Sequence, residues 1–247
     1  LRILNTKHAL RGVFVSYSKS PTMQKPILFV CAIFLLLVSY SCKKKPPVYE
    51  NTGTTGNYMP TSAGSQWSYQ VRGTSNYDYT LTASTRDTVI GSTTFRVFEN
   101  NNDPFEYYSK NGGDYIRFSA LPEFNYQPVQ MVFLKDYLLT GQEWLETASV
   151  KVKVGGINVP VTVYNYISIA EKGIDYTVNG VTFKNVIKVV VKPQIKTVLG
   201  IGVDNTNDIY SYYAEGVGMI YNKTMLKIPT GDVDMNKEIK LVAYTIK

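Results

Sequence analysis

From Tyr58 onward, apolar and polar residues alternate with a period of two, in short runs rich in β-branched and aromatic side chains. Such alternation is typical of strands that bury one face. No segment of this region combines a helical spacing of apolar residues with capping residues. We therefore expect an all-β domain over residues 58–247, with its clearest strands at 77–82, 93–98, 150–154, 159–169, 186–191 and 239–246.

Turn residues separate the predicted strands. Asn179-Gly180 lies between two apolar runs and is the strongest hairpin signal, because both residues tolerate the positive φ angles of a type I′ turn. Many consecutive hairpins predict a mostly antiparallel meander, which would form either a curved half-barrel or two packed sheets. Further turns are expected at 100–104, 111–113, 155–156 and 204–208.

An apolar run of 14 residues extends from Ile27 to Tyr40, after a short basic segment that begins at Met23. This layout is typical of a signal peptide. A helix that spans a bilayer needs about 20 apolar residues, so a transmembrane anchor is the weaker interpretation. We expect residues 23–41 to be a signal peptide and residues 1–22 to be an overextended gene start.

Cys42 follows Ser41 directly at the end of the apolar run. A small residue before such a cysteine resembles a lipoprotein signal, whose processing leaves the cysteine N-terminal and acylated. Ser39 stands where these signals usually have leucine, and this looser form resembles lipoproteins of the Bacteroidota, as do the lysines at 43–45. We expect Cys42 to carry a lipid; the alternative is a secreted protein with an unmodified cysteine.

The formal charge of +7 belongs mainly to the leader. Eight of the 26 basic residues and none of the 19 acidic residues lie at or before Lys45, which leaves 18 basic against 19 acidic residues and a net charge of about −1. A neutral domain lacks the basic surface expected of a nucleic-acid-binding protein. We expect contact with a membrane through the lipid, beside which the three lysines would attract anionic head groups.

Residues 42–57 are polar, contain Pro46-Pro47, are rich in Gly and Thr, and show no apolar periodicity. This composition predicts a flexible spacer that holds the domain away from the bilayer.

Catalytic side chains are scarce after Cys42. His8 and Cys31 precede it, so the domain has neither histidine nor a free thiol. This excludes Ser/His/Asp and Cys/His nucleophiles, Cys/His zinc sites and disulfides. Glu143 and Glu146 flank a tryptophan, but on an alternating strand they point to opposite faces, which is a poor geometry for paired acid–base catalysis. We expect no enzyme activity and no cofactor.

Three short motifs recur in the same order along the domain, which predicts an internal duplication with halves at about 58–120 and 130–225. The two halves would be similar antiparallel sheets, or parts of one curved sheet, packed through the Trp and Phe positions. The motifs are Gly-x-x-Trp, Thr-Phe and Tyr-Tyr followed by glycine; they lie at 64–67, 94–95 and 107–113, and again at 141–144, 182–183 and 212–218.

Together with Tyr58-Met59-Pro60, the segments 64–69, 180–189 and 212–220 resemble lipoproteins of the Bacteroidota to which no activity is assigned. The resemblance covers most of residues 58–225. It implies an architecture similar to curved antiparallel half-barrels, of which the LolA-type lipoprotein carriers are the functional example. A role as a carrier of lipid is therefore implied by fold analogy alone.

Tyrosines supply the candidate ligand-binding residues. Tyr107 and Tyr108, with Tyr212 and Tyr213 in the second half, are either aromatic platforms for sugar rings or ordinary strand residues. Adjacent strand residues point to alternate faces, so at most one residue of each pair is available for a shared surface.

The weak metal candidates are Asp204 and Asp208, which lie in a run with oxygen ligands at alternate positions, like the start of a calcium loop. The central glycine and the final glutamate of such a loop are missing, which favours a polar turn and no metal.

The leading interpretation is a noncatalytic envelope lipoprotein with a binding or scaffolding β domain. A carrier of lipid or another hydrophobic ligand is the first alternative and predicts an apolar concave face. A carbohydrate-binding protein is the second and predicts carboxylates in a groove beside exposed aromatic residues. We expect an outer-membrane anchor, with the periplasmic side favoured because residues 43–45 are basic, whereas acidic residues export some Bacteroidota lipoproteins to the surface.

Overall fold

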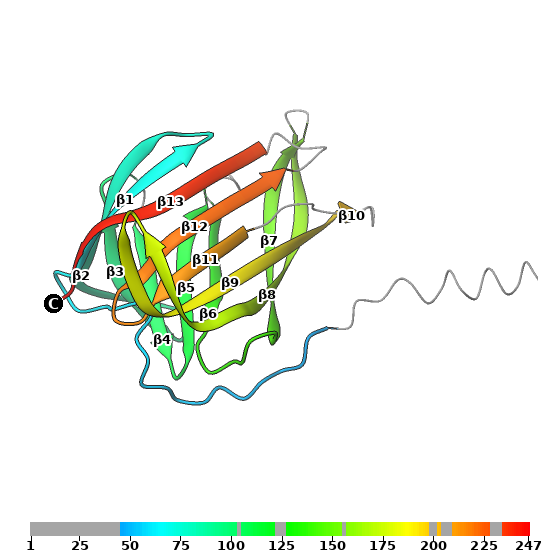
Figure 1. Cartoon of the computed structure of the whole chain (residues 1–247). Coiled ribbons are helices and arrows are strands. Elements are labelled where there is room, and N and C mark those ends of the chain that lie inside the picture. Colours follow the sequence, from blue (N-terminus) through cyan, green and yellow to red (C-terminus); the bar gives the residue numbers. More distant parts are fainter. Residues whose placement is uncertain are drawn as a thin grey trace, which may run out of the picture. The chain divides into compact units, whose positions relative to one another are not determined.

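The computed structural model describes residues 45–102, 105–121, 127–154, 157–197, 202–203, 209–227 and 234–247. Residues Lys45–Lys247 form one compact unit with its own hydrophobic core. All regular elements of the described residues are strands (Figure 1). The described ranges contain no helix of the length and apolarity that a membrane span requires. The predicted all-β class is therefore confirmed.

In the described residues, thirteen strands belong to one sheet. Twelve follow a single path in the order β6-β5-β4-β3-β2-β1-β13-β12-β11-β9-β8-β7, and β10 pairs with β9 outside this path. The strands are β1 Gln66–Gly73, β2 Tyr77–Ile90, β3 Thr93–Asn100, β4 Glu106–Asn111, β5 Asp114–Leu121, β6 Gln127–Lys135, β7 Glu143–Val154, β8 Ile157–Val178, β9 Val181–Thr197, β10 Gly202–Val203, β11 Ile209–Ala214, β12 Gly218–Lys227 and β13 Asp234–Thr245.

The path consists of two antiparallel meanders of six strands each, β1 to β6 and β7 to β13 without β10. An antiparallel ladder between β1 and β13 joins them, from Gln66 opposite Thr245 to Gly73 opposite Lys237, with one shift of register after Ser68. At the other ends of the path, the described residues of β6 and β7 share no ladder. The sheet is therefore a nearly closed barrel, which is the curved arrangement and not the pair of packed sheets (Figure 1).

The predicted repeat motifs lie at corresponding places in the two meanders. Trp67 and Trp144 lie in the first strand of each, and the Tyr-Tyr pairs lie in the fourth, β4 and β11. The meanders extend to Lys135 and Thr245, beyond the ends expected for the halves, because β6 and β13 carry none of the motifs. The topology is compatible with a duplication, which stays a prediction.

Local sequence explains the hairpins and the buried face of the sheet. Asn179 and Gly180 have φ angles of 50° and 81°, and the predicted β8–β9 turn needs a positive φ at both positions. In β1, the alternate residues Trp67, Tyr69 and Val71 are buried, as a strand with one inward face requires. Trp67 also donates its indole N–H to the Val217 carbonyl at 2.6 Å, which ties β1 to the β11–β12 turn.

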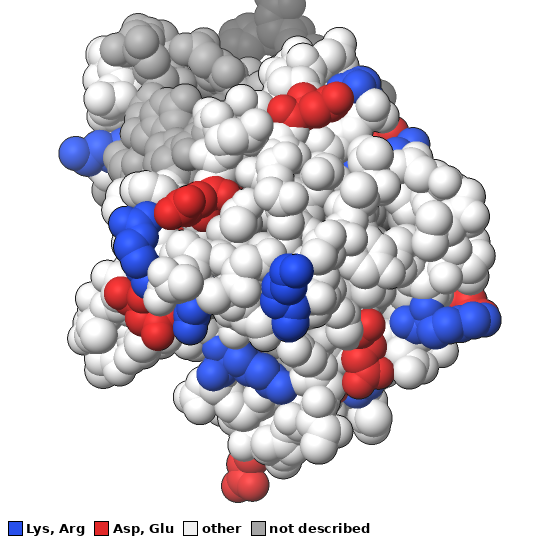
Figure 2. All heavy atoms as spheres, turned by 90° about the vertical axis from the view of Figure 1, so that its left-hand side faces the viewer, with Lys and Arg blue, Asp and Glu red and all other residues white. Residues whose placement is uncertain are grey.

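The outer surface carries charges of both signs. On the face shown in Figure 2, basic and acidic side chains of the described residues are interspersed. Exposed ion pairs include Arg72–Asp78 at 2.9 Å and Arg86–Glu99 at 3.0 Å. Exposed pairs of this kind contribute about 0–1 kcal/mol each, so they say little about stability. The mixture agrees with the near-neutral charge counted from the sequence.

Residues 51–60, which we call the strap, cross one end of the barrel. Asn51 binds the β4–β5 turn, because its amide donates to the Asn111 carbonyl at 2.8 Å and its side-chain oxygen accepts from Gly113 N at 2.9 Å. On another side of the barrel, Gly216 N donates to the Asn57 carbonyl at 2.7 Å. Tyr58, Met59 and Pro60 are buried, so the strap covers this end of the core.

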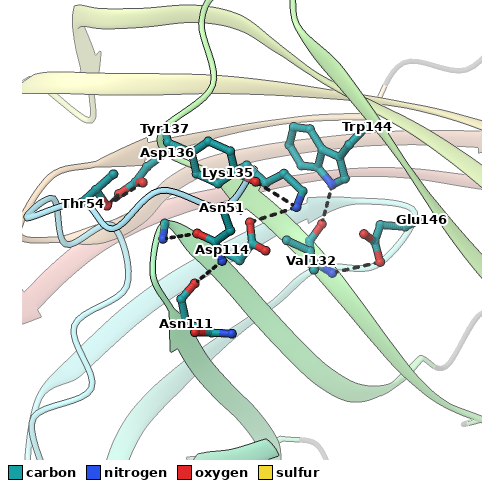
Figure 3. A network of polar contacts seen from close by, with 11 residues as sticks. Asn51, Thr54, Asn111, Asp114, Val132, Lys135, Asp136, Tyr137, Trp144 and Glu146 are labelled. Carbon is teal, nitrogen blue, oxygen red and sulfur yellow. Dashed lines mark hydrogen bonds and ion pairs between the residues drawn. The ribbon is translucent and has the colours of Figure 1, made fainter. Parts of the chain in front are cut away.

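A buried carboxylate holds the middle of the strap (Figure 3). The Thr54 hydroxyl lies 2.7 Å from both carboxylate oxygens of Asp136, a residue that is only 4% exposed. The Tyr115 hydroxyl lies 3.0 Å from the same carboxylate and 2.7 Å from the Gly56 carbonyl. A Cβ at Gly56 would lie 3.0 Å from the Asp136 carboxylate, so the glycine allows this close approach.

The strap differs from the flexible spacer expected for residues 42–57. Within it, Thr54 and Gly56 approach the barrel closely, and both form hydrogen bonds to it. Their small size, which predicts flexibility in an isolated chain, here permits docking. Cys42 and the predicted signal peptide lie outside the described residues.

Candidate functional site

The barrel contains a partly open cavity of about 330 Å³. Every strand of the twelve-strand path contributes side chains to its lining. Binding sites for small molecules usually measure about 300–1,000 Å³, so this cavity is large enough for one small ligand. It is the candidate functional site because it is concave, mainly apolar and contains a few convergent polar groups.

An aromatic layer forms the floor of the cavity, where Met59 of the strap also contributes to the lining. Phe133 on β6 lies between Tyr108 and Tyr213, with ring centroids 5.9 Å and 5.3 Å away. Tyr108 also contacts Phe98 at 4.8 Å, and Phe98 packs on Trp67 at 5.7 Å. The layer thus reaches from β3 and β4 across the interior to β11. Tyr108, Phe133 and Tyr213 line the cavity, whereas Phe98 and Trp67 are not among its described lining residues.

A polar cluster lies on the wall formed by β3, β4 and β5. The Tyr108 hydroxyl donates to a Glu106 carboxylate oxygen at 2.6 Å, and the Asn100 amide lies 3.5 Å from the other oxygen. Arg117 is the cross-strand partner of Tyr108 in the β4–β5 ladder, so both side chains point to the interior. We call Asn100, Glu106, Tyr108 and Arg117 the polar cluster.

Burial and mutual charge set the ionisation of this cluster. Burial acts to lower the pKa of Arg117, but Tyr108 and Glu106 outweigh it and raise that pKa, so the guanidinium remains charged. Burial, and then the charge of Glu106, raises the pKa of the Tyr108 hydroxyl well above its ordinary value of 10.0. Tyr108 is therefore a neutral donor at physiological pH.

Two further tyrosines extend the polar side of the cavity. Tyr69 and Tyr79 stack with ring centroids 5.1 Å apart, and the Tyr69 hydroxyl donates to the Met219 carbonyl at 2.9 Å. Burial is the main cause that raises the pKa of both hydroxyls well above 10.0. Both residues are thus neutral, and both line the cavity.

The second meander supplies a predominantly aliphatic wall. Asn165 and Asn222 are polar exceptions there, and Met131 from the first meander adds a flexible apolar side chain. The cavity is therefore amphipathic, with its ionisable groups concentrated on the first meander. The aliphatic wall consists of Ala148, Val163, Ile167, Val189, Val191, Pro193 and Ile209.

The structure brings together one residue of each predicted tyrosine pair. Tyr108 and Tyr213 both line the cavity, on either side of Phe133. Tyr107 faces outward, where its ring packs near Phe118 at 5.8 Å. The alternation of faces expected from the sequence therefore selects Tyr108 and Tyr213 as the pair with a shared surface.

Tyr212 belongs to an aromatic cluster on the outer face. It stacks on Tyr176 with ring centroids 3.8 Å apart and lies 5.8 Å from Tyr221. Only 7% of Tyr212 and 9% of Tyr221 are exposed, because the tyrosines cover one another. Burial raises the pKa of Tyr176 to about 12. These rings pack together, so Tyr212 does not offer an open platform for a sugar.

Sequence reasoning missed Glu106 and Arg117. A signal was available, because Glu106 lies two residues before Tyr108 and therefore points to the same side of β4. In the same way, Arg117 follows the fully buried Tyr115 by two residues on β5. A charged residue at an inward position of a predicted strand is the pattern that would have identified the cluster.

Side chains close the boundary between β6 and β7, which we call the seam (Figure 3). The Trp144 indole N–H donates to the Val132 carbonyl at 3.0 Å, and Val132 N donates to the Glu146 carboxylate at 3.3 Å. Further along, Val129 of β6 packs against a buried valine cluster of β7 and β8 that includes Val150.

The two glutamates that flank Trp144 point to opposite faces, as expected from the strand pattern. Glu143 is exposed, whereas Glu146 is largely buried at the seam. Burial raises the pKa of Glu146 above its ordinary value of 4.5, an effect that the Val132 N–H and Lys135 partly oppose. Glu146 thus acts in closing the sheet, and the two carboxylates do not converge.

The predicted metal candidates Asp204 and Asp208 lie outside the described residues. Across the ranges that the structure describes, no group of three or more His, Cys, Asp or Glu side chains is placed to hold a metal ion.

Comparisons with known proteins identify a similar fold. No family model and no curated protein matches the chain. A solved structure from Parabacteroides distasonis ATCC 8503, described as a putative lipoprotein, matches with a TM-score of 0.50 and 11% sequence identity. The match covers 78% of this chain and 100% of that one. At this identity the likeness shows the fold alone.

Proposed function

We propose that this chain is a lipid-anchored protein of the cell envelope whose β domain binds one small, largely apolar molecule inside the barrel, without catalysing a reaction. The observation that carries the proposal is the amphipathic cavity of about 330 Å³, which lies between the aromatic floor and the aliphatic wall. It favours the ligand-binding interpretation over a purely scaffolding one, because a scaffold needs no interior space.

The anchor is supported by the sequence around Cys42, where an apolar run ends in Ser41-Cys42. A structural neighbour from the Bacteroidota that is described as a putative lipoprotein agrees with this assignment. The lipid would place the domain at the outer membrane, on the periplasmic side. A single acyl chain binds a membrane only weakly, so firm anchoring requires more than one chain or an added basic patch such as residues 43–45.

The composition of the cavity supports binding over catalysis. Glu106 is the one carboxylate among its described lining residues, and the tyrosines beside it are held neutral by burial. Glycoside hydrolysis commonly uses two carboxylates that flank the scissile bond. This lining therefore favours a hydrophobic ligand over the carbohydrate alternative.

Two measurements test the proposal. Growth of a Bacteroidota host with an alkyne-tagged palmitate should label the wild-type protein, whereas Cys42→Ser should remain unlabelled. Native mass spectrometry of the full-length protein, purified from the envelope fraction, should show one bound small molecule per chain. A labelled Cys42→Ser variant would contradict the anchor. A barrel that is always empty and binds no apolar probe would contradict the ligand.

A further inference from the structure

A short chain connects the predicted lipid to the barrel. Tyr49 packs against the hydrophobic core, and Asn51 binds the β4–β5 turn, so the barrel holds the chain at both residues. Residues 43–48 are all that separates Cys42 from Tyr49. At about 3.3–3.6 Å per residue, the chain from Cys42 to Tyr49 spans at most about 25 Å. A lipid on Cys42 would therefore keep the strap close to the bilayer surface.

The strap marks one end of the barrel, which we call the strap end. The strap is bonded there to the β4–β5 turn, to Asp136 after β6 and to the β11–β12 turn. The antiparallel ladders place three more segments at this end, namely the β2–β3 turn, the tip of the β8–β9 hairpin and the last residues of β13. The β1–β2, β7–β8 and β12–β13 connections lie at the opposite end.

Exposed apolar side chains are concentrated at the strap end. Nine large apolar side chains of the described residues are exposed; five of them lie at this end, and a sixth, Val48, directly precedes Tyr49. Single exposed apolar residues are ordinary, whereas a group of them in one region marks an interaction surface. The five are Val89, Leu139, Val181, Val242 and Tyr244, and the other three are Phe105, Ile157 and Met225.

Two segments of the strap end pack against each other. The rings of Phe183 and Tyr244 lie 6.1 Å apart, so the tip of the β8–β9 hairpin lies against the end of β13. The exposed Val181 and Val242 belong to the same two segments. Leu139 adds a further apolar side chain from the β6–β7 connection and is 65% exposed.

Charge at the strap end neither favours nor opposes contact with a bilayer. Asp136 is buried, whereas Asp114 and Asp175 are paired with lysines. Exposed acidic and basic residues occur in equal numbers, as Glu50, Glu143 and Glu215 against Lys45, Lys110 and Lys247. The apolar side chains therefore decide how this end interacts with its surroundings.

We propose that the strap end rests on the bilayer that holds the Cys42 lipid, with Leu139, Val242 and Tyr244 at the level of the head groups. Apolar side chains gain free energy when they leave water, and tyrosine favours the membrane–water interface. The lipid would supply most of the affinity, and these contacts would fix the orientation of the barrel. This inference rests on the proposed function, because it requires the anchor.

This orientation determines where a ligand enters. Tyr58, Met59 and Pro60 of the strap are buried at the strap end, whereas the lining of the cavity extends to Leu226 and Met235 near the β12–β13 connection. The opening of the partly open cavity therefore lies away from the strap, and in the proposed orientation also away from the bilayer. A ligand would be exchanged on the aqueous side, and not directly with the bilayer that holds the anchor.

Quenching by spin-labelled lipids tests the orientation. The acylated protein, purified from the envelope of its host, is reconstituted in vesicles of phosphatidylethanolamine and phosphatidylglycerol, with a phosphatidylcholine that carries a nitroxide near the head-group end of its acyl chain. Leu139→Cys and Val242→Cys report on the strap end. Ile157→Cys is the matched control, because Ile157 is 71% exposed at the opposite end. Cys31 leaves with the signal peptide and acylation blocks Cys42, so the introduced cysteine alone carries the fluorophore NBD.

The labels at residues 139 and 242 should be quenched at least about twofold more than the label at residue 157, because groups buried about 5–10 Å into the head-group boundary lie near the nitroxide. Leu139→Glu should reduce quenching of the label at residue 242, since a carboxylate is disfavoured there, whereas Ile157→Glu should leave it unchanged. The substituted side chains are exposed, so the core stays intact, which circular dichroism and thermal unfolding verify.

The outcomes separate this inference from the proposed function. Equal quenching at the three positions of the acylated protein, or stronger quenching at residue 157, would overturn the orientation while leaving a lipid-anchored protein. Equal effects of Leu139→Glu and Ile157→Glu on the label at residue 242 would also overturn it. A protein that carries no lipid on Cys42 would overturn the anchor and this inference together.

Discussion

The indole N–H of Trp144 donates to the main-chain carbonyl of Val132 at 3.0 Å, and this hydrogen bond joins two strands that share no ladder in the described structure. Glu146, two residues further along β7, accepts the Val132 N–H at 3.3 Å. The N–H and the carbonyl of Val132, at the edge of β6, are therefore both hydrogen-bonded. Exposed strand edges promote aggregation, so side-chain capping of this kind has a protective value.

Loss of the indole donor should weaken the seam. Trp144→Phe keeps an aromatic ring but leaves the Val132 carbonyl without its donor, so the free energy of unfolding should fall by about 1–3 kcal/mol. Urea denaturation measures this change. In hydrogen-exchange measurements, the variant should exchange faster than wild type in β6, and this increase should be larger than in β3. Unchanged stability together with unchanged exchange in β6 would show that the seam does not depend on this bond.

The ionisation of Glu146 should make stability depend on pH. Burial raises its pKa above 4.5, so the folded state holds this proton more tightly than the unfolded state. The resulting cost is absent below the unfolded pKa of about 4.5 and fully present above the raised folded pKa. Glu146→Gln keeps an acceptor for Val132 N without the charge, so it should stabilise the protein at pH 8.

Thermal unfolding of wild type and Glu146→Gln between pH 4 and pH 8 tests this. The advantage of the variant should shrink as the pH falls through the raised pKa of Glu146 and vanish near 4.5. An advantage that is the same at pH 4 and pH 8 would mean that ionisation of this carboxyl does not affect folding.

The strap should contribute to stability through one hydroxyl. Thr54→Val removes the donor that lies 2.7 Å from both oxygens of the buried Asp136 carboxylate, which should cost about 1.5–3 kcal/mol. Thr55→Val is the matched control, because Thr55 is exposed, and it should stay within about 0.5 kcal/mol of wild type. Equal effects of the two variants, measured by chemical denaturation, would indicate that the strap is bound without this hydrogen bond.

Adjacent tyrosines of β4 should behave differently. Tyr108→Phe removes the hydroxyl that donates to Glu106 at 2.6 Å inside the cavity, so it should lower the free energy of unfolding by about 1–3 kcal/mol. Tyr107→Phe changes the outer face, where the ring packs near Phe118, and should have an effect below about 0.5 kcal/mol. The same denaturation assay compares them, and a larger loss in Tyr107→Phe would contradict the orientation of β4.

Local patterns were sufficient for several strands and for one turn. The period of two predicted the strand at 159–169, in which Val161, Val163 and Ile167 are buried, and the Asn179-Gly180 pair predicted the β8–β9 turn, because both depend on residues close together in the sequence. The choice between a barrel and two packed sheets was not determined, since it depends on the pairing of β1 with β13 at opposite ends of the domain. Local patterns also did not predict the docking of the strap, because Asn51 binds Gly113, which lies far along the chain.

The candidate site was predicted only in part. Alternation along β4 and β11 correctly implied that one tyrosine of each pair would share a surface, and these are Tyr108 and Tyr213. The cavity itself follows from the curvature of the whole sheet, which no local pattern encodes. Arg117 and Glu106 were overlooked because polar residues on strands are usually solvent-facing.

The seam also governs how the barrel can respond to a guest. The ladder between β1 and β13 would act as a hinge. The two six-stranded meanders would then separate at the seam, where the side-chain hydrogen bonds to Val132 would break. The cavity is lined by Met131 and Phe133 of the first meander and by Ala148 of the second. Separation of the two meanders at the seam would therefore widen the cavity directly. The largest ligand that fits would then be limited by two side-chain hydrogen bonds and the valine contacts of the seam, and not by main-chain hydrogen bonds between strands.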